Sequence, residues 1–225
     1  MNDETLVSTL RDNLFTAVVG DILDRMGHRR QFLPPEIKPL RGGMKIVGRA
    51  MPVLVADVYD EVSSTSRGPF NRQFGLMLDA LDDLKPGEIY VATGASRTYA
   101  LWGEIMSTRA THLKAGGTIV DGYVRDGGGI ESLGFPTFCR GLYSQDISCR
   151  GKVIDFRTAI EIGGVRIAPG DLIFGDGEGV LVIPSQVERE VVSAGVEKVS
   201  TESRVVVAIR GGMSAREAFD KYGVM

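Results

Sequence analysis

Cysteine is scarce in this sequence, and the two cysteines present are not spaced as a ligand or redox pair. Cys139 and Cys149 are the only cysteines among 225 residues, and no C-x-x-C motif occurs. Structural zinc sites and disulfide frameworks need more cysteines at characteristic spacings. The sequence therefore predicts a reduced, cytoplasmic setting, with neither a cysteine zinc site nor a disulfide framework.

Long hydrophobic runs and basic clusters are also missing. No segment approaches the roughly 18 uncharged apolar residues that cross a bilayer. The N-terminal segment, MNDETLVSTLRDN, begins acidic and lacks the apolar core of a signal peptide. The formal charge is −3 and lysine and arginine are dispersed, so the sequence offers no electrostatic surface for nucleic acid or an anionic membrane. We expect a cytoplasmic protein with neither of these partners.

Glycine is abundant, and the rest of the composition is that of an ordinary globular protein. The chain is 43% hydrophobic and 24% charged, and 29 of its residues are glycine. So many glycines predict tight turns between short elements. The length suits one domain better than two. Because no internal repeat or linker interrupts the chain, residues 1–225 are predicted to form a single domain.

The order of helical and strand patterns predicts an α/β architecture. Apolar residues recur at helical spacing in residues 14–26 and again in residues 70–84. Ser185 and Glu188 have the spacing of a capping box, which predicts that a long helix begins there. Short apolar or β-branched runs between turn residues predict strands. These runs are 45–55 (interrupted near Pro52), 89–92, 118–120, 152–156, 159–162, 165–167, 172–174 and 180–183.

The segment from residue 102 to residue 126 predicts a helix followed by a buried strand. Trp102, Met106, Ala110 and Leu113 share one face of the predicted helix. The pair at 116–117 is Gly-Gly, which we expect to supply the left-handed residue that ends this helix. The next run, Thr-Ile-Val, is β-branched and predicts the strand.

Arg125 and Asp126 follow this strand and form the candidate site. They lie next to a run of three glycines, 127–129, which we expect to be a loop. Glu104 stands at the start of the preceding helix. A cation and a carboxylate at the end of a strand, opposite a helix N-terminus, are arranged like a small site for an anion and a metal. The alternatives are a surface ion pair for Arg125 and Asp126, and a helix-dipole partner for Glu104.

Several spaced motifs resemble those of one family. They are Gly103-Glu104-Ile105-Met106, the strand ending in Asp121-Gly122, Arg125-Asp126, Gly134-Phe135-Pro136, and the PGD…GDGEGV…IP pattern of residues 169–184. Together they are similar to the regulator-of-ribonuclease-activity-like family. Its enzymatic branch contains the metal-dependent 4-hydroxy-4-methyl-2-oxoglutarate and 4-carboxy-4-hydroxy-2-oxoadipate aldolases. The resemblance implies a single-domain α/β/α sandwich like the phosphohistidine swivelling domain. It also implies a homotrimer or homohexamer with active sites at subunit interfaces.

The resemblance also implies a role for each residue of the candidate site. The backbone N–H groups of residues Gly103, Glu104, Ile105 and Met106 would bind the carboxylate of a small 2-oxo acid substrate. Arg125 would bind substrate oxygens, and Asp126 would be the direct ligand of a divalent metal. Glu104 would hold the water shell of that metal. The ribonuclease-regulator branch lacks the aspartate after the arginine, so the presence of Asp126 favours an enzyme.

The chemistry of a pyruvate-releasing aldolase agrees with these residue types. Cleavage of a 4-hydroxy-2-oxo diacid builds negative charge on the 2-oxo oxygen, which either a lysine Schiff base or a metal can stabilise. No lysine in the sequence has the apolar context of a Schiff-base lysine. Mg²⁺, or Mn²⁺ in its place, binds through one or two carboxylates, so Asp126 with Glu104 acting through water would suffice. The same enolate arises from oxaloacetate, which predicts a decarboxylase side activity. The alternative is a non-catalytic, protein-binding regulator of the ribonuclease-inhibitor type.

Overall fold

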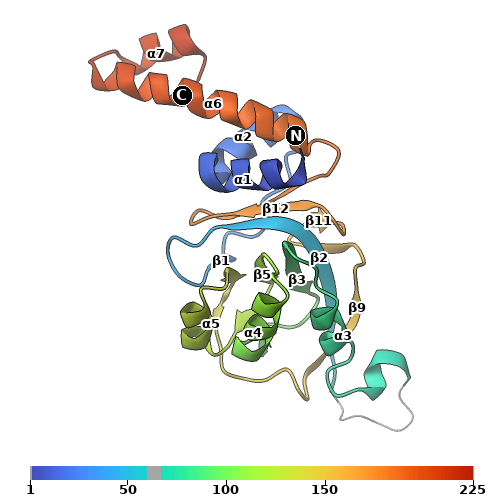
Figure 1. Ribbon diagram of the computed structural model, residues 1–225. Helices are drawn as coiled ribbons and strands as arrows, with labels where there is room; N and C mark the ends of the chain where they lie inside the picture. The colour runs from blue at the N-terminus through green and yellow to red at the C-terminus, as the bar shows by residue number, and fades with distance from the viewer. Residues whose placement is uncertain (1, 60–66, 225) are drawn as a thin grey trace.

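The computed structural model describes residues 2–59 and 67–224, which fold around a mixed β-sheet (Figure 1). The strands of this sheet are β1 (Lys38–Pro39), β2 (Ile46–Asp57), β3 (Glu88–Thr93), β5 (Gly117–Val120), β7 (Thr137–Cys139), β9 (Gly151–Phe156), β12 (Leu172–Gly175) and β13 (Val180–Ile183). Their spatial order is β1–β7–β5–β3–β2–β12–β13, and β9 also pairs with β2. Strands β2, β3, β5 and β7 are parallel, whereas the others pair antiparallel.

Pro52 does not interrupt β2, contrary to the interruption predicted near it. The first part of β2, up to Arg49, pairs with β12, and the part from Val53 onward pairs with β9. Pro52 falls between these two antiparallel partners while β3 pairs with the other edge of β2. A proline has no backbone N–H to donate to a ladder, so it is tolerated where one partner strand has ended and the next has not begun.

Helices cover both faces of the sheet, as predicted for an α/β/α sandwich. Helices α1 (Asp3–Asn13), α2 (Thr16–Arg25) and α6 (Glu188–Arg210) lie on one face, and α3 (Met77–Asp82), α4 (Glu104–His112) and α5 (Gly127–Leu133) lie on the other (Figure 1). A hairpin of β10 (Ile160–Ile162) and β11 (Val165–Ile167) packs a further apolar cluster against the sheet. The α/β class expected from the sequence is therefore confirmed.

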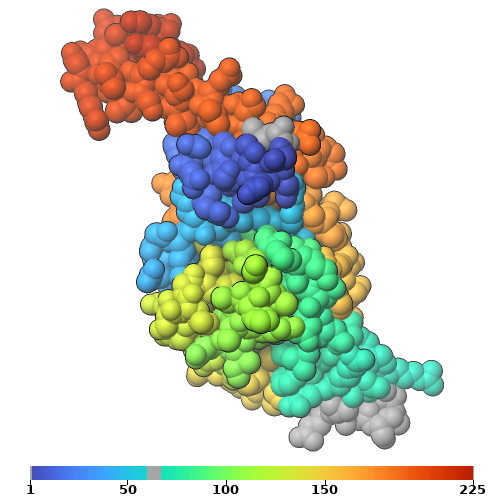
Figure 2. Space-filling view, in the orientation of Figure 1, coloured from blue at the N-terminus to red at the C-terminus, as the bar shows by residue number. Residues whose placement is uncertain are grey.

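The end of α6 and helix α7 (Ala215–Tyr222) project away from the rest of the molecule (Figure 2). A small cluster that includes Val205 and Ala218 joins the two helices. Ser214 forms a capping box with Glu217 at the start of α7. The predicted capping box at the start of the long helix is wrong, because Val187 precedes α6 without a side-chain cap. None of the helices that the structure describes is long and apolar enough to cross a membrane.

Two further predictions about helices need correction. Helix α1 (Asp3–Asn13) was not predicted from the sequence, because few of its residues are apolar. Leu6 and Leu10 are its buried residues. The predicted helix over residues 70–84 is only a short 3₁₀ turn, Gly68–Asn71, followed by α3. Between them, Gly75 adopts φ 63°, and a Cβ there would stand 2.1 Å from the Val153 carbonyl oxygen. This close approach to β9 requires glycine and prevents a continuous helix.

The helix that starts at Glu104 also ends differently from the prediction. Lys114, with φ 61°, supplies the left-handed residue after α4, rather than the glycine pair at 116–117. The two glycines instead allow close contact with neighbouring backbone. A Cβ at Gly116 would lie 3.0 Å from the carbonyl oxygen of Gly87, and one at Gly117 would lie 2.6 Å from that of Pro136. These glycines therefore position the start of β5 in the sheet.

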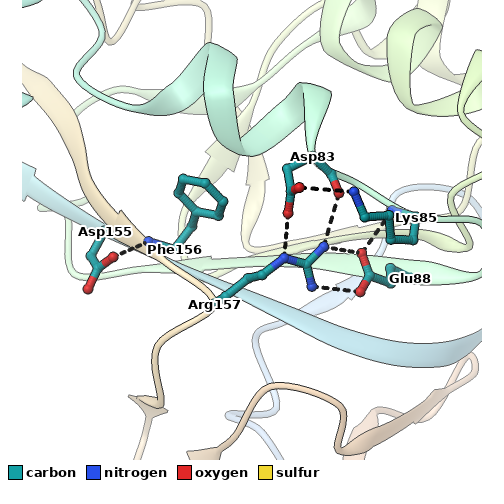
Figure 3. Close-up of polar contacts among 6 residues, drawn as sticks. All are labelled: Asp83, Lys85, Glu88, Asp155, Phe156 and Arg157. Carbon is teal, nitrogen blue, oxygen red and sulfur yellow. Dashed lines mark hydrogen bonds and ion pairs between the residues drawn. The ribbon is translucent and has the colours of Figure 1, made fainter.

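A cluster of ion pairs fastens the amino end of β3 to the end of β9 (Figure 3). The guanidinium group of Arg157 donates to Glu88 Oε1 at 2.7 Å and Oε2 at 2.8 Å, and to the carbonyl oxygen of Asp83 at 3.0 Å. It also donates to the Asp83 carboxylate, which accepts from Lys85 Nζ at 2.9 Å. We call Arg157, Asp83, Lys85 and Glu88 the Arg157 clamp.

Candidate functional site

The candidate site lies beyond the carboxyl ends of the parallel strands. After β3, β5 and β7 the chain forms three short strands, β4 (Ala100–Trp102), β6 (Tyr123–Val124) and β8 (Gly141–Leu142), which pair in parallel as a second small sheet. Helix α4 follows β4, and helix α5 follows β6. Ligands of α/β proteins bind at this edge of a parallel sheet, because the loops and helix N-termini converge there.

A pocket of about 220 Å³ opens at this edge, between α3, the start of α4 and the residues after β6. Most of its lining is apolar, and its charged residues are Arg125, Asp126 and Asp146. The remaining lining residues are Phe74, Met77, Leu78, Leu81, Ala100, Leu101, Trp102, Gly103, Ile105, Met106 and Ile147. The structure thus brings together five of the six residues predicted for the site: Gly103, Ile105, Met106, Arg125 and Asp126.

The start of α4 is shaped to receive a negatively charged group. Its N-cap residue is Gly103, which has no side chain that could cap the helix. Trp102 is almost completely buried, and its ring nitrogen donates to Ser107 Oγ at 2.7 Å. That hydroxyl in turn donates to the Gly103 carbonyl oxygen at 3.1 Å, which fixes the first turn against the core. The first N–H groups of a helix have no partner within it, so they are available to an anion here.

Asp126 has a backbone conformation that keeps its carboxylate away from the usual capping role. Its φ is 58°, and it precedes α5 without a side-chain capping bond. Its carbonyl oxygen accepts from Gly129 N at 3.0 Å and Ile130 N at 3.1 Å. The carboxylate lies against α4, since a Cβ built on Gly103 would stand 2.9 Å from Asp126 Oδ2. The residues after Asp126 form α5 rather than the predicted loop.

Arg125 is held at the pocket by its backbone and by a carboxylate that the sequence did not single out. Its N–H donates to the Trp102 carbonyl oxygen at 2.9 Å, which joins the residue after β6 to the residue before α4. Its Nη1 pairs with Asp146 Oδ2 at 2.6 Å, and its Nε lies 3.7 Å from Asp126 Oδ2. The side chain is 38% exposed, so the guanidinium remains accessible from the pocket.

Glu104 lies beside the pocket rather than in its lining. It is the first residue of α4 and is exposed, and its carboxylate packs over the first turn of α5. A Cβ on Gly129 would stand 2.2 Å from Glu104 Oε2. One glycine of the Gly-rich run is thus needed to make room for this side chain. The predicted role of Glu104 in the water shell of a metal stays a prediction.

The residues present fit a cation that needs few protein ligands. Within residues 2–59 and 67–224, no three His, Cys, Asp or Glu side chains are grouped closely enough to enclose a metal. Asp126 offers a carboxylate that is 46% exposed and is free of a capping bond. Mg²⁺ binds through one or two carboxylates and retains several waters, so Asp126 with Glu104 nearby matches its donor requirement.

Asp121 is used for structure rather than for a ligand. Its Oδ1 accepts from Arg140 Nε at 2.6 Å and from Arg97 Nη2 at 3.3 Å, and its Oδ2 accepts from Thr93 Oγ1 at 3.1 Å. These partners connect the ends of β3, β5 and β7. Both oxygens are occupied, so Asp121 is not available to a metal.

No sequence pattern pointed to Asp146 or showed that α3 would line the pocket. Asp146 follows β8 in a loop without local periodicity, and only tertiary packing brings it to Arg125. The apolar residues of α3 were recognised as an amphipathic stripe. An amphipathic pattern does not show whether its apolar face meets the core or a cavity, and Met77 and Leu81 of this stripe line the pocket.

Comparison with known proteins agrees with this geometry. The chain belongs to the RraA-like family (Aldolase/RraA), because the model of that family matches residues 16–182. A relative from Halalkalibacterium halodurans, provisionally named a 4-hydroxy-4-methyl-2-oxoglutarate aldolase, is 31% identical over 91% of this chain and 89% of its own length. Protein DlpA of Legionella pneumophila is 32% identical over 93% of this chain, which spans only 32% of DlpA.

A solved structure shares the fold at lower identity. RraAS2 of Streptomyces coelicolor, described as an unusual member of the RNase ES inhibitor RraA protein family, superimposes with a TM-score of 0.76. The match covers 90% of this chain and 96% of RraAS2 at 23% identity. At that identity the likeness establishes the fold alone. The family resemblance inferred from the sequence motifs is confirmed.

Proposed function

We propose that this protein is a divalent-metal-dependent aldolase that cleaves a 4-hydroxy-2-oxo acid and releases pyruvate. One observation carries the proposal: Arg125, Asp126 and the N-terminus of α4 line the same small pocket at the carboxyl edge of the parallel sheet. The name given to the Halalkalibacterium halodurans relative supports the same reaction class. The pocket is smaller than the roughly 300–1,000 Å³ of drug-sized sites, which suits a small acid.

The reaction breaks the bond between C3 and C4 of the substrate. The 4-hydroxyl loses its proton, C4 becomes a carbonyl, and the electron pair of the broken bond forms the enolate of pyruvate. Protonation of this enolate at C3 then gives pyruvate. A bound Mg²⁺ or Mn²⁺ would supply Lewis-acid stabilisation of that enolate. In this proposal Asp126 is the residue that holds the metal, and Glu104, which lies beside the pocket, would accept the hydroxyl proton through a water molecule.

Arg125 and the start of α4 would recognise the half of the substrate that becomes pyruvate. The N–H groups at residues 103–106 suit the 1-carboxylate, because a helix N-terminus carries partial positive charge. The planar guanidinium of Arg125 can donate to the oxygen where negative charge develops. Asp146, paired with Arg125 at 2.6 Å, would orient that guanidinium. Oxaloacetate yields the same enolate on decarboxylation, so we propose this as a side activity.

We further propose a homotrimer or homohexamer in which copies meet near the pocket. The observation in support is the exposure of apolar residues around it. Ile105 is 82% exposed, Leu142 is 59% exposed and Leu78 is 56% exposed. Large apolar side chains grouped at the surface favour association. Sedimentation or light scattering would measure the assembly, and a monomer at micromolar concentration would contradict this part.

The test of the proposed reaction is pyruvate release, followed through lactate dehydrogenase, from 4-hydroxy-4-methyl-2-oxoglutarate and from oxaloacetate. We expect turnover with Mg²⁺ or Mn²⁺ and none after EDTA treatment, with recovery when the metal is restored. Calorimetric titration with Mn²⁺ would measure metal binding independently of activity. Metal binding without turnover of any 4-hydroxy-2-oxo acid would refute the aldolase. Absence of both would favour the protein-binding regulator that was the alternative from the sequence.

A further inference from the structure

A second pocket, of about 390 Å³, lies at the amino ends of the parallel strands. It opens between α1, the first part of β2 and the turns that precede β3 and β5. Helix α4 connects the two pockets, because Gly103 at its start lines the candidate site and Lys114, just after its end, lines this one. We call it the amino-end pocket, and its charged lining residues are Asp3, Arg11, Lys45, Arg49 and Lys114.

Positive charge is in excess among these residues. Arg49 is neutralised, because it pairs with Asp3 and with both carboxylate oxygens of Glu188. The other three cations are Arg11, Lys45 and Lys114, and none of them pairs with a carboxylate of residues 2–59 or 67–224. The amino-end pocket therefore contains three cations whose charge no described acidic side chain balances.

The surroundings hold this charge in place without cancelling it. Lys45 Nζ donates to the carbonyl oxygens of Arg11 at 2.7 Å and Leu14 at 3.2 Å, which fixes the ammonium group at the end of α1. An ammonium group has three donors, so one remains for a ligand. The nearby carboxylates of Asp83 and Glu88 already accept from Arg157 in the clamp.

Lys114 is held in a backbone conformation that lysine rarely adopts. Its φ is 61°, and the left-handed region is unfavourable for a residue with a Cβ. Among the described residues, the other non-glycine residues with a positive φ are Asp126 in the candidate site and Arg157 in the clamp. Glycine or asparagine would end α4 in this conformation at lower cost. The positive charge is thus the property that distinguishes lysine at this position.

We propose that the amino-end pocket binds a small polyanion, a molecule with two or three negative charges on phosphate or carboxylate groups. Arg11, Lys45 and Lys114 would donate charge-assisted hydrogen bonds to its oxygens. The volume of the pocket lies in the range of sites for small molecules. The site is separate from the proposed aldolase reaction and uses none of its residues.

Calorimetric titration of the whole protein with pyrophosphate and with citrate tests this proposal. Buffer with EDTA at constant ionic strength excludes binding through a metal. We expect saturable binding at one site with a Kd below about 1 mM for at least one of them, and acetate, a monoanion, at least about 10-fold weaker. Tighter binding of pyrophosphate would indicate a phosphate ligand, and tighter binding of citrate a polycarboxylate. No saturable binding of either would overturn the proposal.

Two variants assign the binding to this pocket. Lys114→Asn removes the charge and tolerates the left-handed conformation, so it should weaken binding about 10-fold without lowering the thermal unfolding temperature. Arg11→Gln, on the exposed side of α1, should weaken binding by a similar factor. Lys221→Asn is the matched control, because Lys221 is exposed on α7 and does not line the pocket. It should leave the Kd unchanged.

The remaining outcomes separate this inference from the proposed function. Binding that survives both pocket variants, or that is lost in Arg125→Ala instead, would overturn the amino-end pocket. An equal loss of affinity in Lys221→Asn would show a general effect of net charge and would overturn it as well. Because the titration needs neither metal nor turnover, polyanion binding by a protein that releases no pyruvate would support the pocket and leave the aldolase refuted.

Discussion

Two clusters of arginine and carboxylate groups lie at opposite ends of the parallel strands, and they differ in how completely their charges are paired. At the amino end of β3, the Arg157 clamp joins one guanidinium to two carboxylates and a carbonyl oxygen (Figure 3). At the carboxyl edge, Arg125 has one close partner, Asp146, and lies 3.7 Å from Asp126. Arginine and carboxylate groups thus stabilise the fold in the clamp, where every charge is paired. At the candidate site some of these groups remain able to bind a ligand.

The surroundings of the two clusters explain this difference. The two guanidinium groups are similarly exposed, Arg157 at 32% and Arg125 at 38%, so the clusters differ in the number of their partners. The clamp joins the residue after β9 to the end of α3 and the start of β3, and each of its groups has a fixed partner. The site has glycine at 103 and 129, where a Cβ would collide with Asp126 or Glu104. Space and unpaired hydrogen-bonding capacity at the carboxyl edge are the properties of a site that binds a ligand.

The largest effect is expected from Asp126→Asn. Asparagine tolerates the left-handed backbone conformation that Asp126 adopts, so the fold should remain while the negative charge is lost. Metal-dependent pyruvate release should fall to background, and Mn²⁺ binding measured by calorimetry should weaken by at least about 10-fold. Unchanged turnover would show that Asp126 does not hold the metal.

Arg125→Ala should have the next largest effect. Loss of a donor aimed at developing negative charge lowers kcat by about two to three orders of magnitude. Arg125→Lys keeps the charge but not the planar fork, so it should recover only part of that loss. Steady-state kinetics on both variants would measure this, with thermal unfolding as the control for folding. A kcat equal to that of the wild type would remove Arg125 from the mechanism.

Breaking the clamp should change stability and leave the site unchanged. Arg157→Ala removes the partner of Asp83 and Glu88, and we expect a loss of about 1–3 kcal/mol in the free energy of unfolding. Urea unfolding would measure the loss, while the KM of the variant should equal that of the wild type. A variant with the free energy of unfolding of the wild type but a raised KM would contradict the separation of the two clusters.

The Arg157 clamp should also make the free energy of unfolding depend on pH. Arg157, with help from Lys85, holds the pKa of Asp83 below its usual value near 4. A depressed carboxyl pKa contributes stability that is present above the unfolded-state pKa and is lost as pH falls through the folded-state pKa. The stability difference between wild type and Arg157→Ala should therefore narrow below about pH 4. A difference that stays constant from pH 7 to pH 3 would argue against this pairing.

The smallest effect is expected from Gly103→Ala. The added Cβ would stand 2.9 Å from Asp126 Oδ2, so the carboxylate must shift by a few tenths of an ångström. The φ of Gly103 is −159°, which alanine also adopts, so stability should change little. We expect Mn²⁺ affinity to fall by a few-fold, less than for Asp126→Asn, and the two titrations can be compared directly.

The sequence by itself determined the α/β class, most strands and the pairing of Arg125 with Asp126 beside α4. Those features depend on short-range patterns: β-branched runs, glycine-bounded turns, and residues adjacent in the chain. The continuity of β2 through Pro52 and the end of α4 were predicted incorrectly, because long-range contacts decided them. Pro52 is accommodated by a change of partner strand, and Lys114 adopts the left-handed conformation while the glycines after it meet neighbouring backbone.

Only the tertiary structure decided what surrounds the candidate site. Asp146 reaches Arg125 from a loop twenty-one residues further along the chain, and α3 supplies the apolar wall from before the site in sequence. The amphipathic pattern of α3 is the same whether its apolar side chains face a core or a cavity. Local sequence therefore pointed to the groups that we propose for the site, whereas packing between distant segments determined which residues surround them.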